Sequence, residues 1–304
     1  IVVCFSLIAY YHLNSGYSMS SDSKRFSRWA DELIRLDFNL YEFFSIDKNF
    51  NMPSLFFFSV PVVLIALCKV IFINEWQFAF LILNLSFVFF SLIIFVKSLL
   101  LIKVRPVLIS LTLPLIVASV DILIWPRFIL SDMIYAFLVV LATYYVIKGI
   151  VINKISYIGL LFTMVLLLAT RPTAMPVISA IICFVVISKY QIFLKPKIIL
   201  IFLSTIFISI PFIFSLLFLL IENNFNENAK LYYVVNMVNM GMIIHDRPET
   251  WVSAPSNFID ITYIYFLRLI NFFNPHATTF SMIHNVLKMA QTLIIFLSLF
   301  IWLY

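Results

Sequence analysis

The clearest candidate for chemistry in this sequence is Asp22, which lies in a polar stretch, SDSKRFSRWADELIRL (residues 21–36), of an otherwise apolar chain. A carboxylate that reaches an attacking hydroxyl can accept its proton and act as a general base. Asp is also a favoured N-cap, so its alternative role is to cap a helix that begins at Ser23. The two roles are compatible, and the residue types leave both open.

Two arginines are candidates for binding a phosphate, because a guanidinium matches the geometry of phosphate oxygens. Arg171 lies in Thr170-Arg171-Pro172, which is typical of a helix start with Thr170 as the N-cap. Free backbone N–H groups there would complete an anion site. The alternative is an interfacial arginine that reaches the lipid headgroups. Arg127 is the second candidate, and pairing with Asp121 is its structural alternative.

The remaining candidates are one carboxylate and one polar cluster. Asp132 follows Ser131 directly before a long apolar run, and is either catalytic or simply favourable in the first turn of a helix. His245, Asp246 and Arg247 stand together in a later polar segment. Residues of these types can hold a cation, but no second cluster with ligand spacing accompanies them. We therefore assign no metal ligands and expect His245, Asp246 and Arg247 in a loop near the acceptor of a reaction.

The elements that must position these residues are membrane helices. The 304-residue chain is 63% hydrophobic and 11% charged, with a mean hydropathy of +1.09, whereas a soluble protein is apolar in nearer half of its residues. The net charge of +6 would suggest nucleic acid in a soluble protein, but here the bases fall in short connectors between apolar runs, so we expect no nucleic acid. The chain begins with Ile1 and stops inside an apolar run, so we expect a fragment at both ends of one all-α transmembrane domain, 1–304.

The distribution of Lys and Arg predicts the topology. The connectors at 97–105, 148–154 and 189–197 carry eight bases and no acid, so they are expected in the cytoplasm. The segment 14–53, with five bases and six acids, suits the outside. If 54–73 also crossed, the connector at 97–105 would lie outside, so we expect a juxtamembrane or re-entrant helix there. The predicted spans are 1–10, 76–96, 106–125, 132–147, 155–170, 172–188, 198–221 and 289–304, with outer loops at 14–74 and 222–285.

The polar stretch itself predicts an amphipathic helix. Its apolar residues recur at i, i+3, i+4, i+7 and i+8, and the opposite face is charged. Such a helix lies in the membrane interface rather than across the bilayer, because one face requires hydrocarbon and the other water. The apolar stripe consists of Phe26, Trp29, Ala30, Leu33 and Ile34.

The pattern Asp22-Ser23-x-x-Phe26-x-x-x-Ala30-x-x-Leu33, directly after a first span, resembles the first outer loop of the GT-C glycosyltransferases. The order of elements over about residues 1–190 is similar too, with a Pro-containing juxtamembrane helix, a span opening near Asn84 and an acidic residue outside a later span. The resemblance implies a GT-C-like helix bundle with Asp22 at the catalytic centre. It also implies a polyprenyl-phosphate-linked sugar as donor, as in the protein mannosyltransferase and aminoarabinose transferase group. Phe26 replaces the usual Tyr and is a candidate acceptor contact, and Ser23 replaces the common acid.

We therefore expect a multi-pass enzyme of a bacterial plasma membrane that transfers a hexose or pentose on the periplasmic face. Its partners would be the lipid-linked sugar, membrane lipids, and a lipid, glycan or protein acceptor. No cofactor is certain, and a divalent cation is the one candidate. A polysaccharide polymerase or ligase is an alternative, which Arg247 in a long outer loop supports. A transporter or flippase is another, although the chain has only four Gly and its charges sit at helix ends.

Overall fold

The computed structural model describes residues 1–46, 54–152, 156–171 and 173–189, together with residues 263, 266–267, 281–283, 285–290 and 292–293. The chain divides into two compact units, Ile1–Ile192 and Phe193–Tyr304. All elements discussed below belong to the first unit. The predicted span 198–221 and nearly all of the second outer loop, 222–285, lie outside the described residues. The single domain expected over the whole chain stays a prediction.

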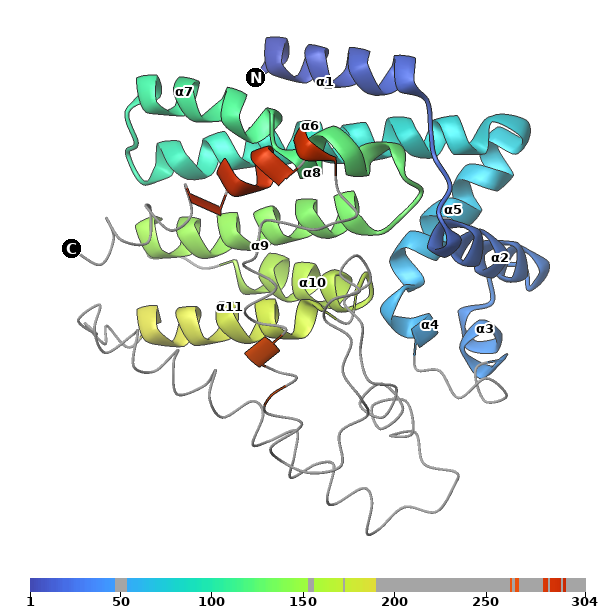
Figure 1. The fold of residues 1–304 in the computed structure, drawn as a ribbon. Helices are drawn as coiled ribbons and strands as arrows, with labels where there is room; N and C mark the ends of the chain where they lie inside the picture. The colour runs from blue at the N-terminus through green and yellow to red at the C-terminus, as the bar shows by residue number, and fades with distance from the viewer. Residues whose placement is uncertain are drawn as a thin grey trace. The chain divides into compact units, whose positions relative to one another are not determined.

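The described residues fold entirely as helices and their connections, as expected (Figure 1). Within them, backbone pairing of the β type is limited to one isolated bridge between Ser18 and Phe128. The elements are α1 (Val2–Ser15), α2 (Ser21–Arg35), α3 (Leu40–Ile46), α4 (Ser54–Phe57), α5 (Ser59–Phe72), η2 (Ile73–Glu75), α6 (Trp76–Leu101), α7 (Pro106–Val117), α8 (Val120–Ile124), η3 (Trp125–Arg127), α9 (Asp132–Ile152), α10 (Tyr157–Leu168) and α11 (Ala174–Lys189).

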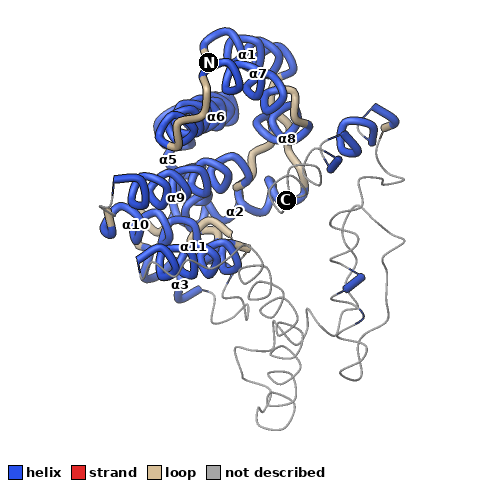
Figure 2. Tube along the Cα trace, turned by 90° about the vertical axis from the view of Figure 1, so that its left-hand side faces the viewer, coloured by secondary structure: helices blue, strands red, loops and turns tan. Residues whose placement is uncertain are grey.

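The long helices of the first unit form a bundle with a smaller layer at one end. Helix α9 contacts α6 on one side and α10 and α11 on the other, and α1 contacts α7. In Figure 1 these helices run side by side, and α2, α3, α4 and α5 gather at their right-hand end. Figure 2 views the bundle from the end opposite to this layer. We call the group α2 to α5 the end layer.

Two of the described helices are long and apolar enough to cross a membrane. One is Asp132–Ile152 and the other is Ser59–Leu101, in which α5 and α6 count together. A third crossing results if Pro106–Val117 and Asp121–Arg127, which meet at 53°, form one bent span. These helices make the chain a membrane protein. The remaining predicted spans stay predictions, since α10 is a shorter apolar helix.

The break between α5 and α6 bears on the predicted position of residues 54–73. The 3-10 turn η2 separates the two helices, and Ile73 has a φ of 36°, which is unusual for a β-branched residue. A helix of the combined 43 residues would be about 65 Å long, roughly twice the hydrocarbon thickness. The 26 residues of α6 suffice for a crossing on their own. Helix α5 is therefore not needed for that crossing. Its predicted position at the outer face, which would keep the basic connector at 97–105 in the cytoplasm, stays a prediction.

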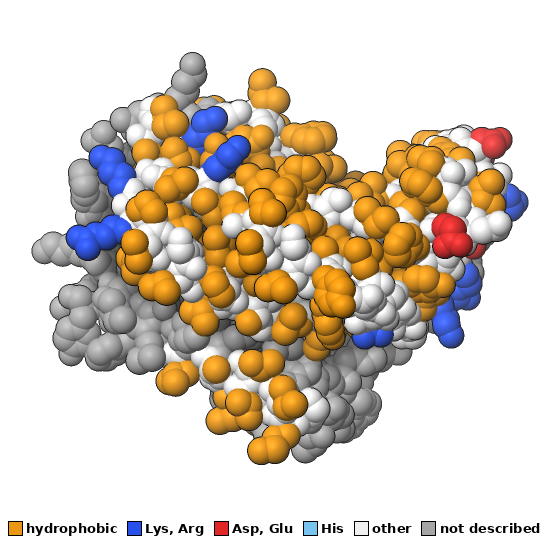
Figure 3. Space-filling view, turned by 90° about the horizontal axis from the view of Figure 1, so that it is seen from above, with side chains coloured by type: hydrophobic (Ala, Val, Ile, Leu, Met, Phe, Trp, Pro, Cys, Tyr) orange, Lys and Arg blue, Asp and Glu red, His pale blue; other side chains and the backbone are white. Residues whose placement is uncertain are grey.

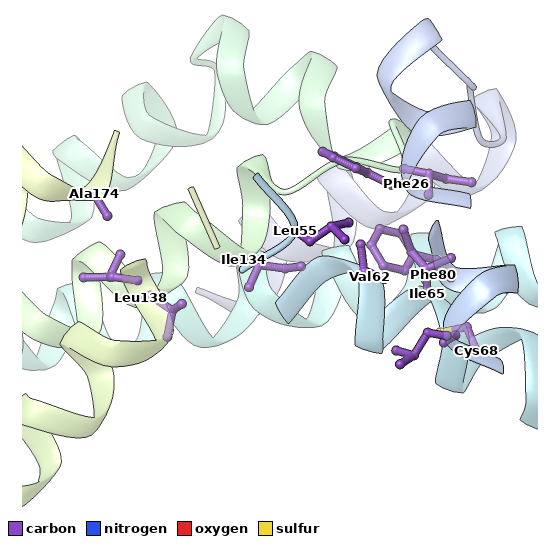
Figure 4. Close-up of a cluster of buried hydrophobic side chains, with 14 of the residues drawn as sticks. Phe26, Leu55, Val62, Ile65, Cys68, Phe80, Ile134, Leu138 and Ala174 are labelled. Atoms are coloured by element: carbon purple, nitrogen blue, oxygen red, sulfur yellow. The ribbon is translucent and has the colours of Figure 1, made fainter. Parts of the chain in front are cut away.

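The amphipathic helix predicted over 21–36 is confirmed, and its apolar stripe packs on α5. Phe26, Ala30 and Leu33 are at most 2% exposed. They belong to one core cluster with the fully buried face of α5, and Figure 4 shows Phe26 beside Val62. Trp29 and Ile34 are partly buried against the same cluster. The stripe therefore faces protein in this structure. The buried residues of α5 are Pro61, Val62, Ile65, Ala66 and Cys68.

Lys69, which interrupts the apolar run of α5, is tied to α2. Its Nζ donates to Asp31 at 2.6 Å and to the Ser27 hydroxyl at 2.8 Å. The same ammonium lies 4.8 Å from the centre of the Trp76 ring. With the Lys69 side chain 13% exposed and that of Asp31 61% exposed, the lysine is the desolvated partner. Lys69 therefore links α5 to α2 through an ion pair and a hydrogen bond.

Charge is distributed unevenly along the bundle. Seen from above, one end of the visible face carries Lys and Arg alone, the other carries acidic residues together with Lys and Arg, and an apolar surface lies between them (Figure 3). Lys103 and Arg105 lie between α6 and α7, whereas α2 in the end layer holds Asp22, Asp31 and Glu32 among its four bases. A connector with bases and no acid is the kind expected on the cytoplasmic side.

Replacing Lys69 should loosen the end layer. We expect Lys69→Met to lower the free energy of unfolding by about 1–2 kcal/mol, because it removes hydrogen bonds made by a charged donor. Amide hydrogen exchange in α2 should speed up in the same variant. The matched control is Lys24→Met, which makes the same change at an exposed lysine of α2 and should cost less than about 1 kcal/mol since that side chain is largely solvated. Equal effects of the two substitutions would contradict the role given to Lys69.

Candidate functional site

Helix α2 begins with a capping box that does not involve Asp22. Ser20 is the N-cap, its hydroxyl accepts from the Ser23 N–H at 3.1 Å, and the Ser23 hydroxyl accepts from the Ser20 N–H at 3.1 Å. The prediction that Asp22 caps a helix beginning at Ser23 is therefore wrong, because two serines in the right spacing satisfy the free N–H groups first. Asp22 lies in the first turn, and its side chain is 54% exposed.

The carboxylate of Asp22 has a single ion-pair partner among the described residues, Arg25 at 3.0 Å. The guanidinium carbon of Arg25 lies 5.3 Å from the centre of the Trp29 ring and 5.8 Å from that of the Phe26 ring. These cation–π contacts restrict the position of the guanidinium. Its Nε is buried and has no hydrogen-bond partner. Asp22 thus sits beside a fixed cation and remains open to an incoming group.

Phe26, a predicted acceptor contact, has a packing role in this structure. Its ring lies 5.1 Å from that of Phe58 and 5.7 Å from that of Trp29, and the residue is 2% exposed. The three rings join the first turns of α2 to the residue that precedes α5. A contact of Phe26 with an acceptor stays a prediction.

Asp132 and Arg171, predicted separately, form an ion pair with each other. Asp132 is the first residue of α9, and its carboxylate accepts from Arg171 Nη1 at 2.5 Å. The side chains are 19% and 34% exposed, respectively. The two residues lie 39 positions apart in the sequence, so no local sequence pattern predicts the ion pair.

The helix start predicted at Thr170-Arg171-Pro172 is wrong. Thr170 lies two residues after α10 instead, and its hydroxyl donates back to the Leu166 carbonyl at 2.6 Å, a bond that threonine readily makes to the preceding turn. Helix α11 begins at Ala174. Arg171 therefore belongs to the turn between α10 and α11, and its Nη1 contacts a carboxylate.

Arg127, the second candidate for phosphate binding, ends the 3-10 turn η3. Its Nε is buried without a hydrogen-bond partner, and its guanidinium lies 5.9 Å from the centre of the Phe128 ring. Asp121 accepts instead from the indole N–H of Trp125, at 3.1 Å. Within the described residues the expected pairing of Asp121 with Arg127 is therefore not found.

A single buried amide holds the segment that carries Arg127. Asn84, 1% exposed on α6, donates from Nδ2 to the carbonyls of Pro126 and Phe128, both at 3.0 Å. The same segment pairs with the chain that leads into α2, because the Ser18 N–H donates to the Arg127 carbonyl at 2.8 Å. The sequence analysis named Asn84 only as a residue near the start of a span and gave it no role. A polar side chain within an apolar helix is the feature that could have indicated a structural or functional role.

Three links bring the candidate residues to one end of the bundle. The bridge between Ser18 and Phe128 joins the approaches to α2 and α9. The Val60 N–H donates to the Ala169 carbonyl at 3.1 Å, which joins the start of α5 to the end of α10. The aromatic contact between Phe26 and Phe58 joins α2 to α5. The candidates that gather at this end are Asp22, Arg127, Asp132 and Arg171.

Two further expectations concern the later loop and metals. His245, Asp246 and Arg247 lie outside the described residues, so their placement near an acceptor stays a prediction. In the described part of the chain, no three His, Cys, Asp or Glu side chains are grouped so that they could hold a metal ion. The candidate site is therefore built from carboxylates and guanidiniums.

Comparison of the chain with protein-family models, with curated proteins and with solved structures finds no match. The resemblance to the GT-C glycosyltransferases consequently depends on the loop motif and the order of elements. Any function has to be argued from the site itself.

Replacing Asn84 should destabilise the site's scaffold. We expect Asn84→Ala to lower the free energy of unfolding by about 2–4 kcal/mol, because two buried carbonyls would lose their donors at roughly 1–3 kcal/mol each. Thermal denaturation of the protein in detergent would measure this loss. Ser86→Ala on the same helix is the control, since that hydroxyl donates only to the Ile82 carbonyl of its own helix. A small effect of Asn84→Ala would show that the Arg127 segment is held by other contacts.

Proposed function

We propose that this protein is an integral-membrane glycosyltransferase of GT-C-like architecture, and that its donor is a polyprenyl-phosphate-linked sugar. The observation that carries the proposal is that the segments bearing two carboxylates and two guanidiniums are linked at one end of an apolar helix bundle, where Asp132 and Arg171 form an ion pair. These four side chains come from α2, η3, α9 and the turn after α10. The opposite end carries the basic connector between α6 and α7, so the site would face the periplasm.

Asp22 is proposed as the general base. It takes the proton from the acceptor hydroxyl as the oxygen attacks the anomeric carbon of the sugar. Two features support this role: Ser20 rather than Asp22 caps the helix, and the carboxylate is 54% exposed beside Arg25. The acceptor is a hydroxyl group of a lipid, glycan or protein.

Arg171 and Arg127 are proposed to stabilise the leaving phosphate. When the bond between the anomeric carbon and the phosphate oxygen breaks, negative charge develops on the phosphate, and a positioned guanidinium lowers the energy of that state. Arg127 has a buried Nε without a partner. Arg171 has Asp132 as its present partner. The enzyme would thus supply a base at the acceptor and cations at the leaving group.

The direct test is a transfer assay on the full-length protein in membranes, with radiolabelled polyprenyl-phosphate sugars as donors. Asp22→Asn should lower the transfer rate by about 10²- to 10⁴-fold, the usual contribution of general base catalysis. The matched control is Asp37→Asn, which makes the same change at an exposed acid just after α2. Asp37 has a φ of 49°, a conformation that Asn tolerates, so this variant should transfer at the parent rate.

Two results would favour other functions. If Arg171→Ala abolished transfer while Asp22→Asn did not, a polysaccharide polymerase or ligase would replace the glycosyltransferase. If no donor were consumed and lipid-linked glycan crossed the bilayer, the protein would be a flippase. Both comparisons require that the Asp22→Asn variant inserts into the membrane to the same extent as the parent protein.

A further inference from the structure

The proposed phosphate receptor is already occupied by a carboxylate of the same chain. Arg171 Nη1 lies 2.5 Å from Asp132 Oδ1, and the arginine side chain remains 34% exposed. A phosphate that binds both terminal nitrogens of Arg171 in the bidentate manner needs the Nη1 group that Asp132 now occupies. Such binding requires Asp132 to give up that hydrogen bond.

Asp132 is well placed to leave. It is the first residue of α9, so the free N–H groups and the dipole of the helix stabilise its charge without Arg171. Its side chain is 19% exposed, which lets water reach the carboxylate. Water competes for both partners of a partly exposed pair, so this pair is easier to break than a fully buried one. A phosphate offers three oxygens and a bidentate geometry that a guanidinium prefers.

Tyr135 is placed to hold Arg171 during such an exchange. It stands one turn after Asp132 on α9, and the guanidinium of Arg171 lies 5.9 Å from the centre of its ring. The Tyr135 hydroxyl donates to the Thr173 carbonyl at 3.2 Å, so the same residue also fastens the turn that carries Arg171. The interaction of a cation with an aromatic face does not use the N–H groups that a phosphate needs.

We propose that Asp132 is an exchangeable counter-ion of Arg171, which the phosphate group of a polyprenyl-phosphate ligand displaces, whether donor or leaving monophosphate, and that Tyr135 is a positioning residue that keeps the guanidinium in place. The exchange breaks one ion pair and forms another, with no covalent change. The inference rests on the proposed function for the identity of the phosphate, and it assigns Asp132 a positioning role in place of a catalytic one.

Binding of a polyprenyl monophosphate to the full-length protein in nanodiscs of zwitterionic lipid tests the exchange, with the uncharged polyprenol as the reference probe. Asp132→Asn should tighten binding of the phosphate by about two- to fivefold, because it removes a competitor of modest strength. Asp132→Ser, which retains a residue suited to the first turn, should act in the same direction. Arg171→Ala should weaken binding by about tenfold or more. Arg28→Ala, which removes an exposed charge of the end layer, should leave the affinity unchanged.

Two tyrosine variants test the positioning role. Tyr135→Leu should weaken binding of the same probe by about two- to fivefold, the contribution of an exposed cation–π contact. Tyr135→Phe keeps the ring but loses the hydrogen bond to the Thr173 carbonyl, so its affinity should lie between those of the parent and Tyr135→Leu. Tyr144→Leu is the control, since Tyr144 is on the same helix and its ring contacts Lys148 instead. Equal affinity in Tyr135→Leu and the parent would overturn the positioning role.

The kinetic readout separates a counter-ion from a catalytic group. In the transfer assay, Asp132→Asn should lower KM for the donor and leave kcat within a few-fold, whereas a lost acid or base would lower kcat by about 10²-fold or more. Weaker or unchanged phosphate binding in Asp132→Asn and Asp132→Ser would overturn the exchange. If the variants changed phosphate binding as expected but the protein transferred no sugar, the counter-ion exchange would be supported and the glycosyltransferase function would be rejected.

Discussion

The arrangement of the site depends on one buried amide in a membrane helix. A membrane span cannot leave polar backbone groups without partners, because the hydrocarbon offers none. The backbone around η3 needs donors for its carbonyls, and the buried Asn84 of α6 supplies them to those of Pro126 and Phe128. Once that turn is fixed, its backbone pairs with Ser18 on one side and leads into α9 on the other. The starts of α2 and α9 are therefore positioned by the same interaction.

The end layer adds a second constraint, which concerns the membrane surface. Helix α2 has one apolar face and would lie in the lipid interface if it were alone. In the structure its stripe packs on α5, and Lys69 joins the two helices through Asp31 and Ser27. The charged face of α2 consequently remains exposed on a helix whose position is fixed by α5. The end layer thus holds Asp22 at an exposed position on a packed helix.

Local features of the fold were predictable from the sequence, and long-range partners were not. The stripe from Phe26 to Leu33 predicted α2 because helical spacing is a local property. Long apolar runs likewise predicted α6 and α9. The cap at Ser20 was missed because Asp22 is an equally good capping type, and only the reciprocal bond with Ser23 decides between them. The predicted cap at Thr170 was wrong because its hydroxyl turns back to α10.

The pairing of Arg171 with Asp132 meets a general requirement of partly desolvated cations. A guanidinium away from bulk water is costly unless an anion compensates it, so an empty receptor needs an internal counter-ion. Arg171 meets this requirement with a carboxylate from another helix, which no local pattern predicts. Arg127 meets part of it with the face of the Phe128 ring, and its Nε remains without a partner. The two arginines are thus compensated differently, one by a carboxylate from another helix and one by an aromatic ring that leaves its Nε without a partner.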